Sequence, residues 1–186
     1  MPTLTPEQYL AIERSADIKS EYYEGQMFAM SGGSLPHSLI PAQLTAALVY
    51  ALRGRGCRVV TSDLKVRVSA QGPYFYPDLT VYCGEPQLAD DHKDILLNPR
   101  VLFEVLSPSS EAFDRGLKFE AYSGIESLQE YVPVSQSRPR MEVYTRQPEG
   151  KWLLSAYTGL EAECRFSSLD CSVRLAEIYD GIVFDD

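Results

Sequence analysis

The sequence predicts one α/β (α+β) domain in which helices flank a central mixed β-sheet. The 186 residues are 45% hydrophobic and contain no linker-like segment, so one chain-long core is expected. Stretches with helical spacing alternate with short apolar runs, and two acidic residues interrupt those runs. We expect residues 1–186 to form a single domain with its core at about 36–146, between an N-terminal helix and hairpin and a β-rich C-terminal extension.

The N-terminal part predicts a helix followed by a hairpin. Thr5-Pro6-Glu7-Gln8 has the residues of a capping box with proline at the first helical position, and the helix should end near Ser15. The runs at 21–23 and 26–30 flank Glu24-Gly25, which is typical of a tight turn between two strands.

The first core helix and three strands follow. Residues 36–52 predict a helix because apolar side chains recur there at helical spacing, with His37 in the first turn. Residues 57–61, 64–68 and 75–83 are apolar runs separated by turn residues, and we expect them to be neighbouring strands of one sheet.

The remaining elements surround the most apolar strand. Residues 84–99 are polar and predict a loop or short helix with few core contacts. The run at 101–106 predicts the centre of the sheet, and a helix should follow it to about residue 123. Further strands are expected at 130–134, 140–145 and 151–157, with a weak helix over 169–179.

Charge and cysteine content restrict the class of protein. The net charge of −9 argues against indiscriminate nucleic-acid binding. It leaves room for a local basic face, for which the candidates are Arg53, Arg55, Arg58, Lys65 and Arg67.

No run of 18 apolar residues exists and no signal peptide is recognisable, so a cytoplasmic protein without a membrane span is expected. The four cysteines lack metal-site spacing and are expected to be reduced, mostly buried thiols.

Two acids stand where strands ordinarily exclude them. Asp78 begins the strand that continues with Leu-Thr-Val-Tyr, and Glu104 lies inside the most apolar run. A lone buried carboxylate costs several kcal/mol unless a cation compensates it. Asp114, Lys118 and Tyr122 recur every four residues and share one helix face, so either a metal ion or Lys118 could compensate the acids. A purely structural ion pair is the alternative.

The order of these motifs resembles that of a restriction-endonuclease-like family of the PD-(D/E)XK nuclease superfamily, a bacterial branch. The resemblance spans nearly the whole chain. Its motifs are Lys19-Ser20-Glu21-Tyr22 with Gly25, His37, Tyr76-Pro77-Asp78, Glu104-Val105-Leu106-Ser107-Pro108-Ser109, Asp114-Arg115-Gly116-Leu117-Lys118-Phe119 with Tyr122, and Leu128-Gln129-Glu130-Tyr131-Val132.

The resemblance implies a restriction-endonuclease-like core and hydrolysis of DNA. Asp78, Glu104 and the main-chain carbonyl of Val105 would hold Mg²⁺, with Mn²⁺ as a substitute, because Mg²⁺ prefers oxygen ligands and one or two carboxylates. The family's usual strand lysine is replaced by Leu106. We expect Lys118 to reach the same space from the next helix and to act as the catalytic lysine.

Five further residues are candidates for supporting roles, each with a plainer interpretation. His37 could be a satisfied histidine at a helix start, and Glu21 and Glu24 could be solvated hairpin residues. Tyr122 and Lys118 could lie on an ordinary helix surface that carries an Asp114–Lys118 pair.

Two other functions stay open. The chain could be an inactive binding module with the nuclease fold, or a metal-dependent hydrolase of another phosphate ester. A homodimer that pairs through exposed β edges in residues 130–160 is expected, and no other protein partner can be inferred.

Overall fold

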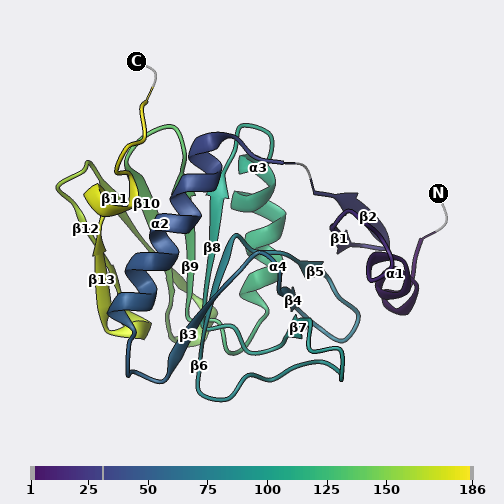
Figure 1. The fold of residues 1–186 in the computed structure, drawn as a ribbon. Helices are drawn as coiled ribbons and strands as arrows, with labels where there is room; N and C mark the ends of the chain where they lie inside the picture. Colours follow the sequence, from purple (N-terminus) through teal and green to yellow (C-terminus); the bar gives the residue numbers. More distant parts are fainter. Residues whose placement is uncertain (1–2, 31, 185–186) are drawn as a thin grey trace.

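The computed structural model describes residues 3–30 and 32–184, and its centre is a six-stranded sheet (Figure 1). The strand order is β11-β10-β9-β8-β6-β3. β8 and β9 run parallel and the other neighbours are antiparallel, so the mixed sheet is confirmed, with β8 in its interior. The strands are β3 (Cys57–Thr61), β6 (Leu79–Cys83), β8 (Val101–Leu106), β9 (Glu130–Ser135), β10 (Arg140–Arg146) and β11 (Trp152–Thr158).

A second, five-stranded sheet carries the N-terminal hairpin, with the order β2-β1-β5-β4-β7. Helix α1 (Pro6–Glu13) begins with the predicted capping box of Thr5 and Gln8. Figure 1 shows α1 with β1 and β2 on one side of the molecule and β12 and β13 on the opposite side. The strands of this sheet are β1 (Ser20–Tyr23), β2 (Gln26–Ala29), β4 (Lys65–Arg67), β5 (Tyr74–Phe75) and β7 (Ile95–Leu96).

Helices cover both faces of the six-stranded sheet. On one face lie α2 (Leu35–Ala51), α5 (Leu175–Ile178) and the hairpin of β12 (Glu163–Phe166) and β13 (Cys171–Arg174). On the other face, α3 (Glu111–Phe113) and α4 (Phe119–Ser123) are joined by a π-helical stretch, Asp114–Lys118. None of the helices in the described residues combines the length and apolar character that crossing a membrane requires.

Alternation along β8 decides where Glu104 points. Val101, Phe103 and Val105 belong to the core under α2, whereas Leu102 belongs to the core under α4. Successive side chains of a strand point to opposite faces, so Glu104 shares the α4 side with Leu102.

The prediction that residues 57–61, 64–68 and 75–83 are neighbours in one sheet is confirmed for residues 57–61 and 79–83 and wrong for the others. β4 and β5 belong to the five-stranded sheet, and β3 and β6 to the six-stranded one. The predicted third strand is interrupted at Tyr76-Pro77-Asp78, where the chain crosses from β5 to β6. Proline cannot donate to a strand ladder, so Pro77 favours a break at this point.

Two further predictions are partly wrong. Residues 84–99 contribute to the core, because Ile95 and Leu96 are only 1% exposed and β7 pairs with β4. Most of residues 169–179 is not helical, since Cys171–Arg174 is a strand and α5 has four residues. In both segments, pairing with another strand determines the conformation, because β7 pairs with β4 and β13 with β12.

The prediction of reduced thiols is wrong for two of the four cysteines. Cys57 and Cys83 face each other across β3 and β6 and form a disulfide. Cys164, which is buried, and Cys171 are free thiols. Sequence spacing does not reveal strand register, so the pairing could not be inferred from it. The cytoplasmic location stays a prediction.

Lys65 does not contribute to a basic face. Its side chain is buried, and Nζ lies 2.7 Å from Glu13 Oε2 and 2.9 Å from Asp94 Oδ2. Arg14 pairs with the same aspartate at 2.7 Å. Burial raises the pKa of Asp94, but hydrogen bonds from Arg14 and Lys65 outweigh this and hold that pKa well below its usual value.

We expect Asp94→Asn to lower the free energy of unfolding by about 1–3 kcal/mol at neutral pH, because Lys65 and Arg14 lose a charged partner. The folded-state pKa of Asp94 is lowered, so its contribution is present above the unfolded-state pKa and is lost as pH falls through the folded-state value. Urea unfolding at neutral and acidic pH should therefore give a difference between variant and wild type that shrinks in acid.

Asp63→Asn is the matched control, because that carboxylate is 82% exposed and, among the residues that the structure describes, forms an ion pair with Lys19 alone. A loss of the same size in both variants would contradict a specific contribution from Asp94.

Candidate active site

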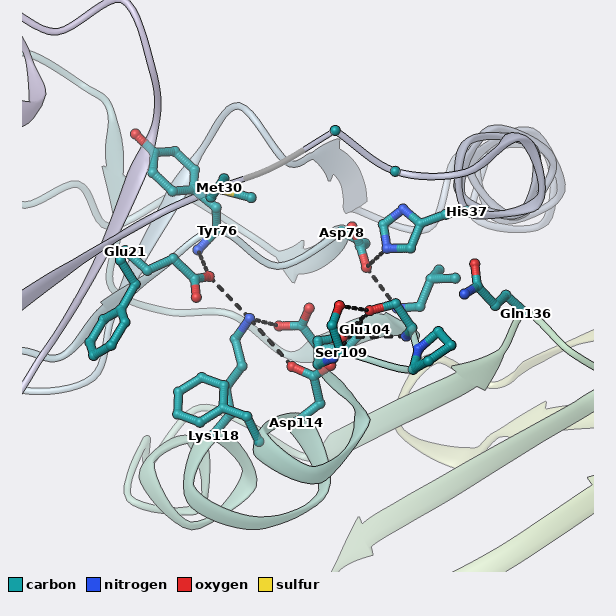
Figure 2. Close-up of a pocket in the computed structure, with 18 of the residues that line it drawn as sticks. Glu21, Met30, His37, Tyr76, Asp78, Glu104, Ser109, Asp114, Lys118 and Gln136 are labelled. Atoms are coloured by element: carbon teal, nitrogen blue, oxygen red, sulfur yellow. Dashed lines mark hydrogen bonds and ion pairs between the residues drawn. The ribbon is translucent and has the colours of Figure 1, made fainter.

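A cavity of about 410 Å³ lies where the two sheets meet. Its wall comes from the hairpin of β1 and β2, the start of α2 with the segment before it, the crossing between β5 and β6, the ends of β8 and β9, and the helix that follows β8. Figure 2 shows the polar side chains of this wall converging from these elements. The crossing segment, which ends in Asp78, thus joins the second sheet to β6 of the first, the neighbour of β8.

Lys118 is the cation at the centre of the cluster and is only 5% exposed. Its Nζ lies 2.9 Å from Glu104 Oε1, 3.0 Å from Glu21 Oε1 and 3.8 Å from Asp114 Oδ1 (Figure 2). The expected approach of this helix lysine to the strand acid is therefore present. Leu106, two residues after Glu104 on β8, is buried.

Tyr122 and Lys118 hold the same oxygen of Glu104. The Tyr122 hydroxyl donates to Glu104 Oε1 at 2.8 Å. Burial raises the pKa of Glu104 well above its ordinary value, and Lys118 opposes the shift. Burial also disfavours the charged form of Lys118, but Glu104 and Glu21 outweigh this and raise its pKa, so the ammonium keeps its proton.

Asp78 accepts a hydrogen bond from the main chain of β8. The Val105 N–H donates to Asp78 Oδ2 at 2.7 Å, and His37 Nε2 lies 3.8 Å from the same oxygen. Burial raises the pKa of Asp78, although the Val105 N–H, His37 and Lys118 oppose it. A Cβ at Gly33 would lie 2.7 Å from His37 Nδ1, so glycine leaves room for the imidazole.

Glu21 belongs to the cluster, whereas Glu24 does not. One oxygen of Glu21 accepts from Lys118 and from the Tyr76 N–H, the latter at 2.9 Å. Glu24 is exposed in the hairpin turn and does not line the cavity. Tyr76 and Gln136 also line the cavity, and no role could be predicted for either side chain because neither interrupts an apolar pattern.

The charge of the cluster suits a divalent cation. The carboxylates of Glu21, Asp78, Glu104 and Asp114 line the cavity, and all but Asp78 lie within 3.8 Å of Lys118 Nζ. Carboxylate oxygens are the ligands that Mg²⁺ prefers. In the described part of the chain, however, no three His, Cys, Asp or Glu side chains are arranged as a ready metal site. The donor chemistry fits, and the metal itself stays a prediction.

The comparisons with known proteins agree with this architecture. A family model described as Uma2, "Putative restriction endonuclease", matches residues 6–173. Two proteins of Synechocystis sp., both described as uncharacterised, match nearly the whole chain. One is 36% identical over 98% of this chain and 95% of its own length, and the other is 34% identical over 88% and 93%.

A solved structure adds independent support for the fold. The crystal structure described as a putative nuclease belonging to DUF820, from Anabaena variabilis, matches with a TM-score of 0.78 over 97% of this chain and 99% of that one. At 16% identity, this match shows the fold alone. The chain thus has the predicted restriction-endonuclease-like fold, and on the family match and the two relatives it belongs to the Uma2 family of restriction-endonuclease-like proteins.

Proposed function

We propose that this protein is a metal-dependent endonuclease that hydrolyses phosphodiester bonds in DNA. The observation that carries the proposal is the 2.9 Å contact between Lys118 Nζ and Glu104 Oε1, beside Asp78 in one cavity. A carboxylate pair that can hold a metal ion, with a neighbouring lysine, can stabilise the charge that develops on the phosphate during phosphodiester hydrolysis. Family membership supports a nucleic acid as substrate.

Each side chain has a distinct role in this proposal. Asp78, Glu104 and the Val105 carbonyl would hold Mg²⁺ or Mn²⁺, which supplies stabilisation of the charge that develops on the phosphate oxygens. The Lys118 ammonium is held by Glu104 and Glu21 and donates hydrogen bonds to the attacking water or to the phosphate.

The remaining residues support this set. Tyr122 orients Glu104 by a hydrogen bond, and Asp114 lies beside the Lys118 ammonium. His37 lies next to Asp78 on the cavity wall.

An inactive nuclease-fold module is the rival function, together with a hydrolase of another phosphate ester. The absence of a strand lysine at Leu106 favours the inactive module, whereas the position of Lys118 favours an enzyme. A cleavage assay with single- and double-stranded DNA, RNA and small phosphate esters separates all three, because each function predicts a different set of substrates that are cut.

We expect the wild-type protein to nick supercoiled plasmid DNA in the presence of Mg²⁺ or Mn²⁺. Asp78→Asn, Glu104→Gln and Lys118→Met should each lower the nicking rate by about 100-fold or more, because each removes a ligand or a positioned proton donor. Gel analysis of initial rates under single-turnover conditions measures the effect.

Two matched controls separate chemistry from general damage. Glu142→Gln removes a buried carboxylate paired with Arg115 and Arg140 outside the cavity, and Lys151→Met removes an exposed lysine. Both should keep nearly the wild-type rate. A Lys118→Met protein that cuts as fast as wild type would exclude the proposed lysine.

Metal binding should be detectable without turnover. A cation that binds only the folded protein at about 100 times its Kd adds about 2.7 kcal/mol of stability. For a chain of this length, that corresponds to a rise in melting temperature of about 5–10 °C. We expect Mg²⁺ or Mn²⁺ to give this rise in wild type and little or none in Asp78→Ala or Glu104→Ala, measured by differential scanning fluorimetry. Identical wild-type curves with and without metal would favour the inactive module.

We also propose that the protein is a homodimer that pairs through β11. Of the strands in residues 130–160, β9 and β10 have neighbours on both sides, so β11 is the free edge. Its seven residues carry no charged side chain, and Leu153 and Leu154 are 56% and 47% exposed. A neutral edge strand can pair with a second copy of itself without placing like charges opposite each other.

Light scattering at micromolar concentration should therefore give the mass of a dimer. Leu154→Lys should shift it to the monomer, because a charged edge residue opposes strand pairing. Leu160→Lys, at an exposed leucine beyond the strand, is the control. A wild-type mass of one chain would contradict the proposed dimer.

A further inference from the structure

A second buried lysine lies outside the cavity. Lys65 is held by Glu13 and Asp94, and none of these three residues lines the cavity. Burying a lysine with its acids costs desolvation energy. Such an ion pair is seldom more stabilising than well-packed apolar side chains of similar volume. This cluster is therefore expected to have a role other than stabilisation. Tyr76, the third neighbour of Lys65, indicates such a role.

Tyr76 connects the Lys65 cluster to the cavity. Lys65 Nζ lies 3.1 Å from the Tyr76 hydroxyl, which donates to Glu13 Oε1. The ring lies under two ammonium groups, with Lys65 Nζ 5.2 Å and Lys19 Nζ 5.6 Å from its centroid. The side chain of Tyr76 is thus fixed at its tip and on its ring.

The main chain of Tyr76 acts on the other side. Its N–H donates to Glu21 Oε1, the same oxygen that accepts from Lys118 Nζ. Two residues further on is Asp78, and the intervening Pro77 has a fixed φ that limits the freedom of this short segment. Holding the Tyr76 hydroxyl in place therefore also restricts the Tyr76 main chain. That main chain in turn positions Glu21, through the N–H, and Asp78 at the start of β6.

We propose that Tyr76 is a positioning residue of the active site, and that the buried Lys65–Glu13 pair exists to hold it. Through Tyr76, helix α1 and strand β4 fix Glu21 against Lys118 and fix Asp78 beside Glu104. This inference rests on the proposed nuclease function. Helix α1 contributes no side chain to the cavity. In this inference it nevertheless helps to position the active-site residues, through Glu13.

The test is Tyr76→Phe, which keeps the ring and removes the hydroxyl. Its matched control is Tyr179→Phe. The Tyr179 hydroxyl is also buried and lies 2.8 Å from the Ser135 and Arg140 carbonyls, but it belongs to the core under α2. We expect Tyr76→Phe to lower kcat for plasmid nicking by about tenfold to 100-fold at saturating Mg²⁺, as misplaced catalytic groups do, and to raise the Mg²⁺ concentration for half-maximal rate. Tyr179→Phe should change neither quantity, although its melting temperature should fall at least as far.

A Tyr76→Phe protein with wild-type kcat and Mg²⁺ dependence would overturn the inference. If Tyr76→Phe does not fold, Glu13→Gln weakens the same hydroxyl contact and replaces it in every measurement.

Amide hydrogen exchange makes the result independent of DNA cleavage. In Tyr76→Phe, but not in Tyr179→Phe, the peptide that carries the Tyr76 amide should take up deuterium faster, since its bond to Glu21 is loosened. A wild-type protein that cuts no DNA would refute the proposed function, and the exchange rates would still decide the role of Tyr76. Unchanged exchange in Tyr76→Phe would refute the positioning role.

Discussion

A charged lysine in the protein interior is the constraint on which this structure depends. Lys118 is buried from water, so its ammonium must be compensated by carboxylates, and these come from separate parts of the chain. Glu21 is on β1 of one sheet, Glu104 on β8 of the other, and Asp114 one turn away on the same helix. One interaction therefore fixes the relative positions of two sheets and a helix, and the cavity lies at their junction.

Much of this arrangement could be predicted from local pattern. An acid inside the apolar run at 101–106 predicts a compensating cation, and the four-residue spacing of Asp114, Lys118 and Tyr122 predicts a shared face. These signals depend only on the periodicity of strands and helices. The contacts among Glu104, Lys118 and Tyr122 agree with them. The catalytic roles of these residues stay predictions.

What could not be predicted depends on pairing between distant segments. The pairing of β7 with β4 recruits Ile95 and Leu96 from a polar stretch, and strand register brings Cys57 opposite Cys83. Lys65 looked like a surface charge because its partners Glu13 and Asp94 lie 52 and 29 residues away along the chain. No local pattern carries such information, since topology alone brings these residues together.

The π-helical stretch at Asp114–Lys118 gives the site a particular sensitivity to chain length. A π turn contains one residue more than an α-helical turn, and such a bulge is what a single inserted residue leaves in a helix. Such a bulge accommodates the extra residue within one turn of the helix. Deleting one residue between Asp114 and Lys118 would reduce their spacing from four positions to three and so change the point from which the Lys118 side chain reaches Glu104. A change in length at this turn therefore alters the spacing of the charged groups even where no residue of the cluster is replaced.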